Sequence, residues 1–150
     1  MGFGEDTLLA WTVRRHGVAA YAPDAVVRHQ VFPVDGADTL RRTRMMRAFP
    51  ALVREVPELR AGTLLRHGVV LNTEADRVPV YATFAAAAVR RRRLATVALA
   101  WWVGTRLVEA RRGHGPVLRR LAAVPVQMAL DVVGTSALVR GSVRSRTVVL

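Results

Sequence analysis

The second half of this 150-residue chain is dominated by three apolar blocks, which are separated by arginine-rich segments. The first block, Val78–Val89, has 12 residues, and the second, Leu94–Val108, has 15 residues, of which only Arg106 is charged. The third, Val117–Val139, is longer but contains three charged residues. Because a helix needs about 20 apolar residues to cross a bilayer, the first two blocks are too short to span one. Blocks of this length are typical of core, re-entrant or interfacial helices.

Most of the positive charge lies in the same half as these blocks. Residues 78–150 hold 12 arginines and only two acids, whereas residues 1–77 hold 11 arginines and nine acids. A basic segment that is also apolar favours an anionic membrane surface over nucleic acid. Proteins that read single strands stack bases on aromatic rings, and the aromatic content here is only 6%. We therefore predict a membrane-associated helical region that binds no nucleic acid.

The N-terminal segment is typical of a short helix followed by two short strands. We expect the helix over residues 5–16, with Gly17 as the glycine that follows its last turn. Two β-type runs come next, residues 18–22 and 25–32, and the Pro23–Asp24 pair between them predicts a turn.

The middle of the chain predicts further helices. Asp38 is a candidate cap for a helix that starts at Thr39, because apolar residues then recur at helical spacing. Pro50 and Pro57 should break or kink that element. Residues 61–71 are expected to form another short helix. The sequence as a whole predicts a mainly α fold with a small β element.

A series of short motifs follows Phe3. In chain order they are Gly4-Glu5-Asp6, Leu9, Trp11, Arg14-Arg15, Gly17, Tyr21, Pro23-Asp24-Ala25 and Val27-Arg28-His29. This order resembles the acceptor-side segment of family 2 glycosyltransferases, of the inverting type with an A-type nucleotide-sugar fold. The resemblance covers about a fifth of the chain. The tail, Leu138–Leu150, also resembles the ending of membrane-associated bacterial members of that family.

The resemblance implies transfer of a sugar from a nucleotide-sugar donor to a hydroxyl of a cell-envelope glycan or lipid-linked acceptor. Asp6 would be the catalytic base, which takes the proton of the acceptor hydroxyl while its oxygen attacks the anomeric carbon. Glu5 and Trp11 would bind the acceptor. His29 matches a position that helps to hold the family's divalent cation, Mg or Mn, or the diphosphate.

Two features of the family are missing from this sequence. There is no Asp-x-Asp motif, which supplies the main metal ligands in the family, and no glycine-rich phosphate loop. We therefore expect a C-terminal fragment of an α/β nucleotide-sugar transferase domain, followed by membrane-associated helices. Residues 1–34 would be the acceptor-side end of the catalytic domain, 35–77 a helical connecting region and 78–150 the basic membrane-associated region. Alone, the fragment should not turn over.

Simpler interpretations exist for each candidate site. Two adjacent acids also stabilise the first turn of a helix, and His29 could be a strand histidine with a satisfied hydrogen bond. The arginines between residues 41 and 47 could form a solvated helix face, or contact a lipid-linked acceptor or phosphate head groups. The run of four arginines after the first apolar block could be a plain turn between core helices. We favour a turn at the cytoplasmic face of the membrane, where these side chains would contact lipid or phosphate. The run consists of Arg90, Arg91, Arg92 and Arg93.

The rival function is a non-catalytic, basic membrane-binding helical module of transferase ancestry.

Overall fold

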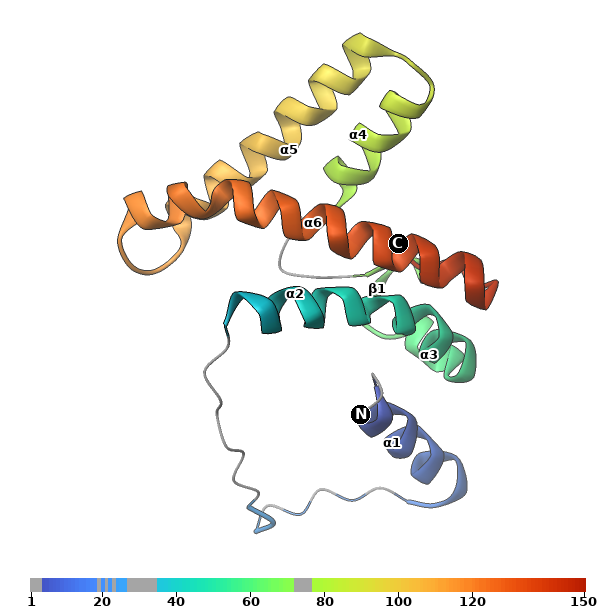
Figure 1. The fold of residues 1–150 in the computed structure, drawn as a ribbon. Helices are drawn as coiled ribbons and strands as arrows, with labels where there is room; N and C mark the ends of the chain where they lie inside the picture. The colour runs from blue at the N-terminus through green and yellow to red at the C-terminus, as the bar shows by residue number, and fades with distance from the viewer. Residues whose placement is uncertain (1–3, 19, 21, 23, 27–34, 72–76) are drawn as a thin grey trace.

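The computed structural model describes residues 4–18, 20, 22, 24–26, 35–71 and 77–150, and over these residues it is mainly helical (Figure 1). Two short strands, β1 Leu65–Arg66 and β2 Val70–Leu71, pair antiparallel. The prediction of a mainly α fold with a small β element is confirmed. The helices, with η marking a 3-10 helix, are α1 Glu5–His16, α2 Gly36–Met45, η1 Met46–Ala48, α3 Phe49–Glu55, η2 Pro57–Arg60, α4 Val78–Ala88, α5 Arg92–Arg112 and α6 Val117–Ser145.

Helix α6 is the element that connects the rest of the fold. Helices α2, η1 and α3 pack along one side of it, and the hairpin of α4 and α5 contacts it as well. Figure 1 shows α2 beside α6, with the α4–α5 hairpin projecting from the opposite side of α6. Helix α1 lies beyond α3, far from the tip of the hairpin.

The hydrophobic core lies between α3, η2, β1, the C-terminal part of α6 and the chain end. Phe49, Leu52 and Val53 recur at helical spacing and so share one face of α3. Full burial of each such apolar side chain stabilises the folded state by about 1.5–3 kcal/mol relative to leaving it exposed. Within the described part of the chain, α4 and α5 contribute nothing to this core, whose buried members are Phe49, Leu52, Val53, Val56, Leu59, Leu65, Leu138 and Val149.

The C-terminal tail folds back onto this core. Arg146 ends α6 in the left-handed conformation, with φ of 52°, and Val149 is then completely buried. The N–H of Leu150 donates to the carbonyl oxygen of Val69 (3.0 Å), and the N–H of Leu71 donates to that of Leu150 (2.6 Å). The tail therefore holds the β1–β2 hairpin against the end of α6.

The predicted cap of the second helix is wrong by three residues. The helix begins at Gly36, and its N-cap is Asp35 instead of Asp38. Asp35 is extended, and its Oδ1 accepts a hydrogen bond from the N–H of Asp38 at 2.7 Å, which satisfies an otherwise unpaired donor of the first turn. The expected breaks at Pro50 and Pro57 are confirmed, because these residues lie in the first turns of α3 and η2.

The predicted helix over residues 61–71 is also wrong, because this segment contains the β1–β2 hairpin. His67 and Gly68 both have positive φ, 53° and 70°, and such a pair turns a hairpin but cannot continue a right-handed helix. Leu65 lies opposite Leu71, with Leu65 facing the core.

Helix α1 covers the predicted residues 5–16, and Gly17 follows its last turn as predicted, in an extended conformation (φ −162°). The strands predicted after it differ from the structure over the described residues. None of residues 18, 20, 22 and 24–26 lies in a strand, because the described chain places no partner strand beside them. The predicted turn is present, since the N–H of Ala25 donates to the carbonyl oxygen of Ala22 at 3.1 Å. The remainder of the second predicted strand lies outside the described residues.

Candidate functional site

The two predicted acceptor-side acids lie in the first turn of α1. Glu5 and Asp6 are both exposed there, where the positive end of the helix dipole favours negative charge. Gly4 precedes them in the left-handed conformation, with φ of 82°, and a Cβ on it would lie 2.5 Å from the Leu52 side chain. Only glycine adopts this positive φ and leaves room for the Leu52 side chain without strain. The acids are therefore held at a defined place beside α3 and remain open to solvent.

Trp11 anchors α1 to the rest of the molecule. Its half-buried ring packs against the core, and the guanidinium of Arg14 lies over its outer face, 4.8 Å from the ring centre, at cation–π distance. The ring thus has a structural role in this fold. Its role in acceptor binding stays a prediction.

A two-pronged ion pair holds the other end of α1. Arg15 donates to Glu58 of η2 through Nε (2.9 Å) and Nη2 (2.7 Å), and Nη2 also lies 3.2 Å from the carbonyl oxygen of Glu55. The hydrogen bonds from Arg15 lower the pKa of Glu58. This pair and Trp11 set the orientation of α1, and so the position of its acidic first turn.

The four arginines at Arg90–Arg93 lie at the tip of the α4–α5 hairpin, and all four are exposed. Arg90 turns the chain in the left-handed conformation, with φ of 55°. Figure 1 places this tip and α1 at opposite ends of the molecule. The structure therefore separates the predicted acceptor acids from the predicted membrane contact. His29, the predicted metal ligand, lies outside the described residues.

A buried polar network, absent from the sequence-based prediction, connects α5 with α6. Asp131 accepts hydrogen bonds from Trp102 Nε1 (3.0 Å) and Arg106 Nε (2.7 Å). A second bond joins Arg106 Nη2 to the other oxygen of Asp131, and Arg106 Nη1 lies 2.7 Å from Glu109. Arg106 is only 9% exposed and Asp131 only 5% exposed. The sequence carries a signal for this pair, because Arg106 is the single charge and Asp131 the single acid of their apolar blocks, and a buried charge needs a partner.

Apolar side chains point outward on the same helix. Leu94, Val97 and Trp101 of α5 are 59%, 68% and 47% exposed, whereas Trp102 and Arg106 face the interior. The surface helix of a soluble protein usually turns such large apolar side chains toward the core. The α4–α5 hairpin therefore presents apolar side chains along α5 and four exposed arginines at its tip, an arrangement that suits contact with lipid.

Among the residues that the structure describes, α6 is long and apolar enough to cross a membrane by length and composition. One third of its most apolar window is buried against the rest of the chain. A core helix passes the same test, so α6 does not by itself establish a membrane span.

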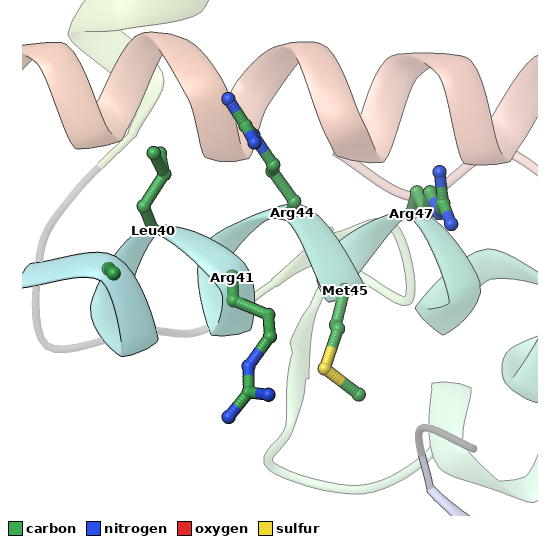
Figure 2. A pocket seen from close by; sticks show the side chains of 6 residues that line it. Leu40, Arg41, Arg44, Met45 and Arg47 are labelled. Carbon is green, nitrogen blue, oxygen red and sulfur yellow. The ribbon is translucent and has the colours of Figure 1, made fainter. Parts of the chain in front are cut away.

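Arg41 and Arg44 of α2 and Arg47 of η1 line a hollow of about 450 Å³, together with Ala37, Leu40 and Met45. Figure 2 shows Arg44 directed toward α6, while Arg41 is directed away from it. Arg41 pairs with Asp38 at 2.6 Å. The arginines of the predicted basic face therefore divide between solvent and the boundary with α6.

A second polar cluster lies where α4 begins. Both terminal nitrogens of Arg77 lie 3.5 Å from Met46 Sδ, and its Nε has no hydrogen-bond partner among the described residues. Burial lowers the pKa of Arg77 and raises the pKa of Tyr81. This cluster packs the α4–α5 hairpin onto α6 and α2 beside Gly134, where a larger residue would meet Arg77.

No three histidine or acidic residues of the described ranges gather closely enough to hold a metal ion. The described residues thus offer no group of three such ligands for the Mg or Mn ion that the family resemblance implies. Comparison with protein-family models, with curated proteins and with solved structures found no match to this chain.

Proposed function

We propose that this chain supplies the acceptor side of an inverting glycosyltransferase at the cytoplasmic face of the cell membrane. The observation that carries the proposal is the acidic first turn of α1, where Asp6 is exposed on a helix that Gly4 and Trp11 fix against the core. A general base must sit on a rigid element and be reachable by the hydroxyl it deprotonates. The order of motifs around this turn resembles that of family 2 transferases.

In the proposed reaction, an acceptor hydroxyl forms a bond to the anomeric carbon of a nucleotide-sugar. The bond from that carbon to the diphosphate oxygen breaks on the opposite face, with inversion, and the hydroxyl proton passes to the carboxylate of Asp6. Glu5 would hold the acceptor by a hydrogen bond. Because the described residues do not assemble a cation site, no step is assigned to a metal here.

The test retains the chromosomal context of the gene. Asp6→Asn is introduced at its own codon, and transfer of labelled sugar from nucleotide-sugars to envelope acceptors is measured in membrane fractions. Glu55→Gln is the matched control, because it removes another exposed carboxylate, which among the described residues pairs with neighbouring Arg54. Loss of transfer in the first variant alone supports the proposal, whereas equal activity in both variants rejects the assignment of the base.

We further propose that the α4–α5 hairpin attaches the chain to anionic lipid. Its support is the outward apolar side chains of α5 together with the exposed arginines at the tip. Each arginine near an anionic membrane surface contributes about 1 kcal/mol to the free energy of binding. Changing Arg90–Arg93 to glutamine should therefore release the protein from anionic vesicles in a sedimentation assay. Retention of full binding at low salt would reject this attachment.

The second candidate function is a non-catalytic, basic membrane-binding module. The observation that favours it is the packing of Trp11 into the core, which gives that residue a structural role independent of any acceptor. In this case Asp6→Asn would leave both sugar transfer and vesicle binding unchanged, and only the hairpin variant would have an effect.

A further inference from the structure

We propose that four arginines at the boundary of α2 and α6 bind the phosphate group of a membrane lipid. This boundary, called the arginine seam below, is formed by Arg44 and Arg47 from α2 and η1 and by Arg140 and Arg144 from α6. The site does not depend on the proposed sugar transfer, because it lies apart from the acidic turn of α1.

The fold brings the two arginine pairs together at one backbone crossing. Helix α6 approaches η1 so closely at Gly141 that a Cβ there would overlap the carbonyl oxygen of Arg47. Arg140 precedes this glycine, and Arg144 lies one turn later. The crossing therefore brings together two pairs of arginines that are more than 90 residues apart in the sequence.

Two adjoining hollows mark the seam. One, of about 310 Å³, is lined by Arg44, Arg47 and Arg140 together with Ser136 and aliphatic residues of α6. The other, of about 400 Å³, is lined by Arg47, Arg140 and Arg144 together with alanines of η1 and α3 and with Gly141. Arg47 and Arg140 thus border both hollows, and each hollow is lined by three of the four arginines.

The seam lacks the countercharge that such a cluster needs. All four arginines are exposed, and none forms an ion pair with a residue that the structure describes. The nearby carboxylates of Asp38 and Glu55 are each paired with a different arginine. Like charges held close together repel one another, so an anion that bridges them is stabilised.

The lining indicates which anion fits. Guanidinium forks bind phosphate oxygens in pairs, which favours a phosphate over a carboxylate with only two oxygens. Apart from Ser136, the other side chains along the seam are aliphatic, and neither of these two hollows is lined by an aromatic ring on which a base could stack. A third hollow, of about 340 Å³, shares Arg140 and is lined by Phe84, Tyr81 and Val139 as well as by the polar Thr135 and Ser136. A phosphate beside apolar surface is the chemistry of a lipid head group.

The test compares vesicles of phosphatidic acid with vesicles of phosphatidylserine at equal surface charge, both in phosphatidylcholine. The seam variant is Arg47→Gln with Arg140→Gln. The control is Arg111→Gln with Arg112→Gln, which removes the same charge from an exposed end of α5. We expect the seam variant to lose affinity for phosphatidic acid by about tenfold or more, with a smaller loss for phosphatidylserine, and the control to lose little for either lipid.

A second variant pair and a soluble probe complete the test. Arg47→Lys with Arg140→Lys keeps the charge but replaces the planar guanidinium, which can donate two hydrogen bonds to one phosphate, with an ammonium. This variant should lose the preference for phosphatidic acid while remaining bound to both kinds of vesicle. Equal losses in the seam and control variants would reject the site. Tight binding of inorganic pyrophosphate or of an oligonucleotide at the seam, without a preference among vesicles, would reject a lipid as its occupant.

Discussion

Arg106 of α5 and Asp131 of α6 form a buried, two-pronged ion pair between two helices whose outward surfaces are largely apolar. Trp102 donates a third hydrogen bond to the same carboxylate. This network is a buried polar connection between the α4–α5 hairpin and α6. It thus fixes the orientation of the hairpin that we propose binds the membrane.

Asp131→Ala should lower the free energy of unfolding by about 3–5 kcal/mol, because it leaves Arg106 buried with its main partner removed. Urea unfolding followed by circular dichroism measures this loss. Glu109→Gln removes the more exposed partner of the same guanidinium, whose side chain is 41% exposed, and should cost at most about 1 kcal/mol.

Replacing both partners, with Arg106→Leu and Asp131→Leu, should recover much of the lost stability, since no unpaired charge then remains buried. If Glu109→Gln were as costly as Asp131→Ala, the buried pair would not be the dominant connection.

Gly141→Ala should destabilise the protein by about 1–3 kcal/mol, because the added methyl group pushes α6 away from the backbone of η1. Gly104→Ala is the matched control within α5, where a Cβ meets no atom within 4 Å. There alanine should stabilise the helix by up to about 1 kcal/mol. The thermal midpoints of the two variants would then shift in opposite directions, and a shift in the same direction would contradict the close crossing.

Val149→Ala should lower the free energy of unfolding by about 1–3 kcal/mol, because Val149 is completely buried where the tail covers the core. Val148→Ala removes the same two carbons from a neighbouring residue that is 59% exposed. It should change stability by no more than about 0.5 kcal/mol. Similar losses in the two variants would mean that the tail does not dock in the described register.

The docking of α1 should weaken at acidic pH through Glu58. Arg15 lowers the pKa of this carboxylate in the folded chain. The stabilisation that the Arg15–Glu58 ion pair gives to the docking of α1 is therefore fully present above the ordinary glutamate pKa of about 4.3. The contribution is lost as the pH falls through the lower pKa of the folded state. The indole N–H resonance of Trp11, followed by NMR against pH, reports the release of α1. Glu58→Gln should remove this pH dependence, and an unchanged titration would show that another group causes it.

The sequence predicts most helices, because long apolar periodicity and prolines determine them locally. It also contains a signal for the hairpin that the prediction missed, since His67-Gly68 is followed by a short apolar run that suits a strand. Asp35 and Asp38 are both acceptable caps by residue type, and only backbone geometry distinguishes them. The arginine seam could not be predicted, because the meeting of Arg47 with Arg140 depends on where α6 crosses η1.

The most direct test of the central claim is the kinetics of sugar transfer by the Asp6→Asn variant, compared with Glu5→Gln, in the chromosomal context. Loss of a general base should lower kcat by about 10²–10⁴-fold, while loss of an acceptor contact should mainly raise KM for the acceptor. Circular dichroism of the two variants should match that of the parent chain, because both side chains are exposed. An Asp6→Asn protein that folds and transfers sugar at the parent rate would contradict the assignment of Asp6 as the base.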